Sequence, residues 1–180
     1  MDPLSKECYT VEEYLSWGEN VRAELYEGML IMLAQPTARH QSVLGEIFVQ
    51  LHAFLKGKSC KAYVAPLGVK LFHGEDTIFE PDIVVICDMS KLDRIYHGAP
   101  DMVVEILSPS TASKDMLLKH RKYLQAGVRE YWVVDPQLKI VRVYLLKNGK
   151  YDSVDYLETG RVPVHTLEGC EIDIQKVFAD

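Results

Sequence analysis

The 180-residue chain carries 20 Lys and Arg residues against 26 Asp and Glu residues, which gives a formal net charge of −6. Hydrophobic residues make up 48% of the chain and charged residues 26%, the profile of an ordinary soluble globular protein. This balance argues against a generic nucleic-acid coat protein or a polybasic membrane binder, although a local basic surface can sit on an acidic protein. The length suits one domain over residues 1–180.

The four cysteines lie far apart, at positions 8, 60, 87 and 170, and form no C-x-x-C pair. A zinc ribbon or a redox pair is therefore not expected, and Cys87, which ends an apolar run, is predicted to be a reduced core residue. The chain shows no signal peptide and no apolar stretch near the ~20 residues that span a bilayer. We expect a cytoplasmic protein without a membrane partner.

The first predicted elements are a helix and an extended segment. The helix runs from Thr10 to Trp17, with Thr10 as its N-cap and Glu13 as the partner in a capping box. Residues 23–33 are predicted to be extended, with a turn near Gly28.

A long helix is predicted next, from about Ala38 to Leu55, because apolar residues recur there at helical spacing. Extended segments follow at Lys61–Ala65 and Gly68–Phe72, and the turn at residues 74–76 predicts a hairpin between Val69–Phe72 and Thr77–Phe79.

Three short runs are rich in β-branched residues and almost continuously apolar: Asp82–Cys87, Met102–Leu107 and Glu130–Asp135. Such runs are typical of strands that are buried on both faces of a sheet. A helix over Ser113–Ala126 separates the second run from the third, and Gly127 suits the position after its last turn.

The C-terminal part predicts a hairpin. Ile140–Leu146 and Tyr151–Tyr156 flank the pair Asn148-Gly149, which is a strong signal for a tight turn, and a short final segment lies near Ile174–Phe178. Helices and strands in this order predict an α/β protein with a central mixed sheet flanked by helices.

Two carboxylates interrupt the apolar strands. Asp82 begins the run Ile-Val-Val-Ile, and Glu105 lies within Val-Val-Glu-Ile-Leu. A buried carboxylate costs several kcal/mol unless a cation, a proton or a metal ion compensates it. Mg²⁺ takes one or two protein carboxylates and keeps several waters, so a metal site and an ion pair with Lys or Arg are both open at this point.

The helix that follows carries Asp115, Lys119 and Tyr123 at positions i, i+4 and i+8, so that they share one stripe, with Lys122 close by. A lysine of this helix could reach the carboxylates of the sheet. The alternative is an exposed helical salt bridge between Asp115 and Lys119.

Taken together, these segments resemble a known family. The matching pieces, in order, are Pro81-Asp82, Val103-Val104-Glu105-Ile106-Leu107-Ser108-Pro109-Ser110, Asp115-x-x-x-Lys119-x-x-x-Tyr123, and Ala126-Gly127-Val128-x-Glu130-Tyr131-Trp132-Val133-Val134-Asp135-Pro136. They resemble the Uma-type family of restriction-endonuclease-like proteins in the PD-(D/E)XK nuclease superfamily. The segment Ala23–Leu30 resembles that family's Glu-Leu-x-x-Gly segment, and His40 matches a histidine of the family.

The resemblance implies a restriction-endonuclease-like fold and a metal-dependent endonuclease acting on DNA. Asp82 and Glu105 would be catalytic metal ligands for Mg²⁺ or Mn²⁺. Leu107 stands where the E-x-K motif has its lysine, so Lys119 is the implied catalytic lysine and Lys122 a less favoured substitute. Glu24 and His40 would support the site. A homodimer is expected by analogy, since two-fold symmetry suits the cutting of two strands.

Two other functions remain open: a non-catalytic nucleic-acid- or protein-binding module that keeps the nuclease fold, and a metal-dependent hydrolase of small phosphoesters. The sequence has no Walker loop and no G-x-G-x-x-G, so a nucleotide cofactor is not expected. Ser108-Pro109-Ser110-Thr111 is interpreted as a helix cap beside Glu105 that could also contact a phosphate. Tyr131-Trp132 is interpreted as core rather than as a stacking platform for bases.

Overall fold

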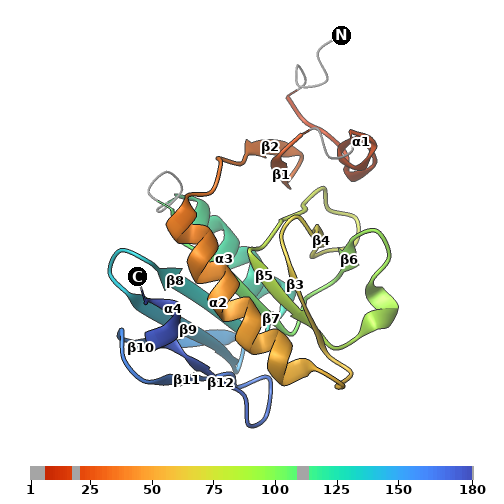
Figure 1. Cartoon of the computed structure of the whole chain (residues 1–180). Coiled ribbons are helices and arrows are strands. Elements are labelled where there is room, and N and C mark those ends of the chain that lie inside the picture. The colour runs from red at the N-terminus through yellow and green to blue at the C-terminus, as the bar shows by residue number, and fades with distance from the viewer. Residues whose placement is uncertain (1–6, 18–20, 109–113, 180) are drawn as a thin grey trace.

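The centre of the computed structural model, which describes residues 7–17, 21–108 and 114–179, is a six-stranded mixed sheet with strand order β10-β9-β8-β7-β5-β3 (Figure 1). Strands β7 and β8 are parallel, and every other neighbouring pair in this sheet is antiparallel. Its strands are β3 (Lys61–Val64), β5 (Ile83–Ile86), β7 (Met102–Ile106), β8 (Glu130–Asp135), β9 (Ile140–Lys147) and β10 (Lys150–Tyr156). The predicted α/β class is confirmed.

Helices cover both faces of the sheet. Figure 1 shows α2 (Ala38–Leu55) crossing one face and α3 (Lys114–Ala126) on the opposite one. The α2 face also packs α4 (Ile174–Val177) and the hairpin of β11 (Arg161–Pro163) and β12 (Glu171–Asp173) into one apolar cluster. None of the helices within the described ranges has the length and apolarity that a bilayer crossing needs.

Alternation along the central strands divides the apolar core into two layers. In β7, Met102 and Val104 join the cluster under α2, while Val103 joins the cluster under α3. All residues of β5 and β7 are buried, as the near-continuous apolar runs predict. A charged residue on either strand therefore lies inside the protein.

The predicted helix and turn signals are confirmed in detail. The capping box at the start of α1 (Val11–Ser16) forms, with Glu13 N donating to Thr10 Oγ1 at 3.2 Å and Thr10 N to Glu13 Oε2 at 3.0 Å. Gly127 follows α3 with a φ of +85°, a conformation that glycine adopts without the strain of a Cβ. Asn148 and Gly149 both have positive φ between β9 and β10, as the tight hairpin requires.

A smaller layer lies at one end of the sheet, on the α3 side. It contains the hairpin of β1 (Ala23–Tyr26) and β2 (Met29–Met32), the parallel pair of β4 (Val69–Lys70) and β6 (Tyr96–His97), and a 3-10 turn, η2 (Met89–Lys91). Leu25 of β1 bridges Ile78, and both are fully buried. This bridge fixes β1, and with it Glu24, against the rest of the protein.

The hairpin predicted between Val69–Phe72 and Thr77–Phe79 is wrong in most of its length. Val69 and Phe79 form a single antiparallel bridge, and β4 instead pairs in parallel with β6. The reason is competition for partners: Ile78 pairs with Leu25 of β1, a strand 53 positions earlier that the local turn signal cannot reveal.

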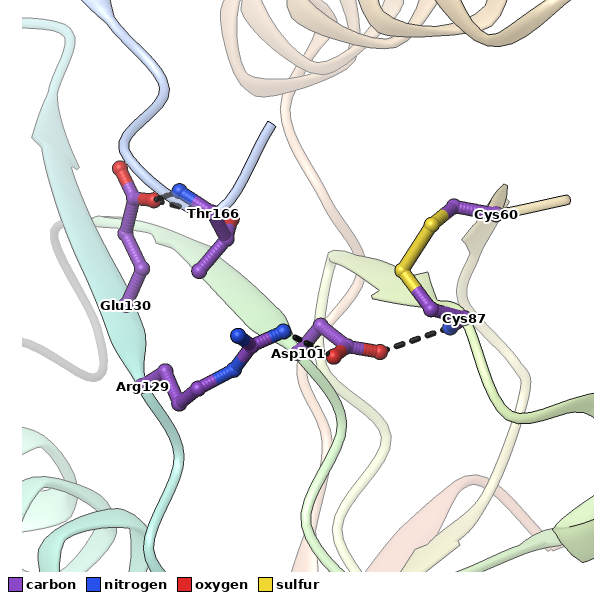
Figure 2. Close-up of a disulfide and its surroundings, with 6 residues drawn as sticks. All are labelled: Cys60, Cys87, Asp101, Arg129, Glu130 and Thr166. Carbon is purple, nitrogen blue, oxygen red and sulfur yellow. Dashed lines mark hydrogen bonds and ion pairs between the residues drawn. A yellow bond between two sulfur atoms is a disulfide. The ribbon is translucent and has the colours of Figure 1, made fainter. Parts of the chain in front are cut away.

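The prediction of Cys87 as a reduced core residue is also wrong, because Cys87 forms a disulfide with Cys60 (Figure 2). Lys61 pairs with Ile86 in the antiparallel ladder of β3 and β5, so Cys60 and Cys87 face each other one position further on. Asp101 Oδ2 accepts a hydrogen bond from Cys87 N at 2.7 Å, and Arg129 pairs with Asp101. A separation of 27 residues hides this pairing from the sequence.

Candidate functional site

The two carboxylates singled out in the sequence come together at one end of the sheet. Ile83 of β5 pairs with Val104 of β7, and continuing this antiparallel register by one position sets Asp82 opposite Glu105. Asp82 Oδ2 accepts a hydrogen bond from Ile106 N at 2.7 Å and lies 3.2 Å from His40 Nε2, in the first turn of α2. Residues from β5, β7 and α2 thus meet at this point.

Helix α3 brings two side chains to Glu105 from the opposite side. Lys119 Nζ lies 3.1 Å from Glu105 Oε1 and 2.8 Å from Glu24 Oε1, and Tyr123 OH donates to Glu105 Oε1 at 2.7 Å. Lys119 and Tyr123 are four residues apart, so the helical repeat aims both at the sheet. All four residues are buried, which makes this a preorganised network rather than a surface salt bridge.

Lys122, the less favoured candidate, lies in a different network. Its ammonium contacts Glu27 at 2.8 Å and also Glu75, and it lies over the rings of Tyr26 and Phe72. These contacts hold the β1–β2 hairpin against α3. Within the described residues Lys122 does not line the pocket that contains Asp82 and Glu105, and its position indicates a structural role.

A pocket of about 310 Å³ opens beside these groups. The side chains of Asp82 and Glu105 are 17% and 12% exposed, so a small ligand can reach both carboxylates. The pocket is lined by residues before α2, at the start of α2, after β3, before β5, at the end of β7, and by Lys119: Arg22, Leu33, Ala34, Gln35, Pro36, His40, Gln41, Leu44, Val64, Ala65, Pro66, Glu80, Asp82, Glu105, Ile106, Ser108 and Lys119.

Glu80 is a pocket residue that the sequence analysis did not identify. Its backbone N–H donates to Glu24 Oε1 at 2.7 Å, and its carboxylate accepts a hydrogen bond from Tyr14 OH at 2.7 Å. Burial raises the pKa of the Glu80 carboxyl. A signal existed, since Glu80 lies two positions before Asp82, but it lies outside the apolar strands in which a charge stands out.

The electrostatics of the pocket favour a bound cation. Burial raises the pKa of Glu105 to about 8, Lys119 opposes this shift, and the negative charges of Asp82 and Glu24 add to it. Acids near one another in a buried site repel, so the ionised form of Glu105 is favoured when positive charge is added.

The donor set fits a hard divalent cation. Within the described residues no three His, Cys, Asp or Glu side chains are arranged as ligands of one ion. Mg²⁺ needs fewer, because it commonly binds one or two carboxylates and completes its shell with waters and a substrate phosphate. Asp82 and Glu105 could hold such an ion, and oxygen ligands suit Mg²⁺ and Mn²⁺ better than softer metals.

Of the remaining candidates, some line the pocket and others do not. His40 is 8% exposed and contacts Asp82, so its hydrogen bonds reach beyond its own helix to the pocket. Ser108 lines the pocket, whereas residues 109–111 and the side chain of Asp115 lie outside the described part. Tyr131 and Trp132 are fully buried, which confirms core packing and leaves no face for a base.

The chain is similar to known proteins over most of its length. A family model named Uma2 and described as "Putative restriction endonuclease" matches residues 11–175. The fold matches the crystal structure of a "putative nuclease belonging to DUF820" from Anabaena variabilis with a TM-score of 0.79 and 24% identity, over 94% of this chain and 97% of that one. An uncharacterized protein of Synechocystis sp. is 28% identical over 115 residues, 62% of this chain and 60% of that protein. The chain therefore belongs to the Uma2 family and has the restriction-endonuclease-like fold that its sequence predicts.

Proposed function

We propose that the protein is a Mg²⁺- or Mn²⁺-dependent endonuclease that hydrolyses phosphodiester bonds of DNA. The observation that carries the proposal is the convergence of Asp82, Glu105 and Lys119 at one solvent-accessible pocket. Membership of the Uma2 family supports it.

In this proposal Asp82 and Glu105 hold the ion at the end of the sheet. A divalent ion bound there would lower the pKa of a water and offset negative charge on the phosphate. Lys119 donates a hydrogen bond to the attacking water or to a phosphate oxygen, because its ammonium already lies at Glu105. Glu24 forms a second ion pair with Lys119, with 2.8 Å between Nζ and Oε1, and so fixes the position of the ammonium.

Two further side chains fix the carboxylates. Tyr123 OH donates to Glu105 Oε1 and so sets the direction in which the other oxygen points. His40 Nε2 contacts Asp82 Oδ2, and Nδ1 of the same ring has no hydrogen-bond partner among the described residues. An imidazole in this position orients the Asp82 carboxylate.

The missing lysine of the E-x-K motif has a physical substitute. Leu107 replaces it on the strand, yet Lys119 reaches Glu105 from α3 at 3.1 Å. A lysine at either position can supply positive charge to the same carboxylate, so the change at Leu107 is compatible with catalysis.

The test is cleavage of supercoiled plasmid and of single-stranded DNA in Mg²⁺, Mn²⁺ or EDTA, with Lys119→Gln and Lys122→Gln compared. Both lysines lie on α3, are buried and contact two carboxylates, so they are a matched pair. We expect Lys119→Gln to reduce cleavage by about 10²–10³-fold, the cost of one transition-state donor. Folded Lys122→Gln should cleave at the wild-type rate.

Three results contradict the proposal. Cleavage that continues in EDTA excludes the metal, and cleavage that continues in Lys119→Gln excludes this lysine. A purified wild-type protein that binds DNA but does not cut it with either metal would favour the non-catalytic binding module.

A further inference from the structure

A second hollow, of about 370 Å³, adjoins the pocket. The two share Arg22, Pro66 and Glu80 in their walls and therefore lie side by side; the pair of hollows is called the groove below, with its near part at Asp82 and Glu105. The far part is lined by residues of α1, of the segment before β1 and of the connections around β4 and β6: Tyr14, Leu15, Val21, Gly68, Arg94 and Ile95.

The two parts of the groove differ in charge. Asp82 and Glu105 line only the near part, where Lys119 is the buried cation, and Glu80 lines both parts. The far part adds Arg94 to the shared Arg22. A chain with one negative charge per nucleotide is repelled by the acids, so binding it requires cations nearby.

Arg94 is available to a ligand. It is exposed, and no ion pair or side-chain hydrogen bond engages its guanidinium within the described residues. Among the other exposed arginines, Arg142 contacts Asp155 at 2.6 Å and Arg161 contacts Glu171 at 3.5 Å, whereas Arg121 on α3, like Arg94, has no ion pair within the described residues. The side chain of Arg22 is likewise exposed; it donates a long hydrogen bond to Gln35 Oε1, at 3.5 Å, and its charge also acts on the Glu80 carboxylate.

The backbone that carries Arg94 is fixed in place. Ile95 N donates to Asp93 Oδ1 at 2.9 Å, and Tyr96 N donates to Gly68 O at 2.8 Å. The segment packs so closely on Gly68 that a Cβ there would meet Ile95 Cγ2 at 3.1 Å. Glycine permits this approach, and Arg94 is therefore held at the wall of the groove.

We propose that this groove binds the phosphodiester backbone of a nucleic-acid strand, with Arg22 and Arg94 contacting successive phosphates beside the bond at Asp82 and Glu105. The inference rests on the proposed function and adds the path of the substrate. Guanidinium groups suit this role, since they bind phosphate oxygens in pairs of hydrogen bonds.

The test is equilibrium binding in EDTA, where the proposed nuclease does not cut, measured by fluorescence anisotropy with one oligonucleotide in single-stranded and duplex form. We expect Arg22→Gln and Arg94→Gln each to weaken binding by about 5–10-fold in at least one form. Each should also reduce the slope of log K against log salt by about 1. Arg161→Gln is the control, because its side chain is 68% exposed on β11, outside the groove.

The two proposals fail in different ways. If Arg94→Gln binds as tightly as the wild type, or loses no more affinity than Arg161→Gln, the groove is not the path, whether or not the protein cuts DNA. A wild-type protein that binds neither form also overturns the inference. Binding with the expected arginine dependence, but without cleavage in Mg²⁺ or Mn²⁺, would keep the groove and remove the nuclease activity.

Discussion

Two buried glutamates on neighbouring strands, Glu105 on β7 and Glu130 on β8, have opposite surroundings. Glu130 is fully buried and accepts hydrogen bonds from neutral donors, at 2.8 Å from Trp132 Nε1, 2.7 Å from Thr166 N and 2.9 Å from Thr166 Oγ1. Figure 2 shows the contact with Thr166. Glu105 instead lies by a pocket, near other acids, with Lys119 and Tyr123 on one oxygen.

Burial of an acid does not by itself indicate a metal site. Asp82 and Glu105 stand out in the sequence as charges at apolar strands, but Glu130 begins an equally apolar strand and is more deeply buried. A carboxylate whose oxygens are saturated by fixed donors has a structural role. A carboxylate that shares a pocket with other acids has a deficit of positive charge, which a ligand can supply.

The largest expected difference is in catalysis. Glu105→Gln should lower plasmid cleavage by at least about 10³-fold, because the amide weakens the metal site and perturbs Lys119 together. Glu130→Gln should leave the rate per folded molecule unchanged. Equal losses in the two variants, after correction for the folded fraction, would contradict the division between them.

In the free energy of unfolding, by contrast, the loss of Glu130 should cost more than the loss of Glu105. Glu130→Ala leaves the buried donor of Trp132 and the part-buried donors of Thr166 without their acceptor; a buried orphan costs ~1–3 kcal/mol, so we expect a loss of about 3 kcal/mol in the free energy of unfolding. Urea unfolding at pH 7 measures it. A loss below about 1 kcal/mol would mean that water replaces the carboxylate.

The pH dependence of stability is the third difference. The pKa of Glu105 is about 8 in the folded protein against 4.5 in the unfolded chain, so the folded state binds the extra proton. Its contribution to stability is therefore present below pH 4.5 and is lost as the pH rises through 8. Without divalent metal, the wild type should lose about 2–3 kcal/mol more than Glu105→Gln between pH 6 and pH 8.5, at ~1.4 kcal/mol per pH unit below the folded-state pKa. If urea unfolding gives the same pH-dependent change in the free energy of unfolding for both proteins, the prediction is wrong.

The smallest expected effect concerns the hydroxyl on Glu105. The hydrogen bond from Tyr123 OH to Oε1 favours the ionised form of Glu105, and Tyr123→Phe removes it. Cleavage should increase with pH as Glu105 ionises, and in Tyr123→Phe the midpoint of this increase should lie about half a pH unit higher. Tyr131→Phe is the matched control, since Tyr131 OH has no hydrogen-bond partner among the described residues. A shift in the control but not in Tyr123→Phe would assign the effect elsewhere.

Local signals predicted the elements well. Thr37 before Ala38–Leu55 and the glycine after α3 set helix ends through bonds within a few residues, and Asn148-Gly149 sets its hairpin in the same way. The convergence of Asp82 and Glu105 was reachable because Asp82 directly precedes one recognisable strand and Glu105 lies within another. The position of Lys122 at Glu27 and Glu75 was not, because it depends on where the β1–β2 hairpin docks.

For the same reason, the environment of Glu130 could not be predicted. Its acceptor role depends on Thr166, 36 residues later in a connection without a local signal. The tyrosine at Glu80 comes from a helix 66 residues earlier. Contacts of this kind follow from tertiary packing, which decides whether a buried acid is closed off or left beside a cavity.

The covalent link between Cys60 and Cys87 ties the far end of β5, the strand that Asp82 precedes. Closing a loop of 27 residues removes unfolded-chain entropy worth about 3.5 kcal/mol at room temperature in the loop-closure model. The same polypeptide accordingly has two stabilities, one for each thiol–disulfide state, and a reducing cytoplasm would favour the weaker one. Alkylation of intact cells followed by mass measurement shows which thiol–disulfide state the cell maintains. The result reports the redox character of the compartment and also which of the two stabilities applies to the strand that Asp82 precedes.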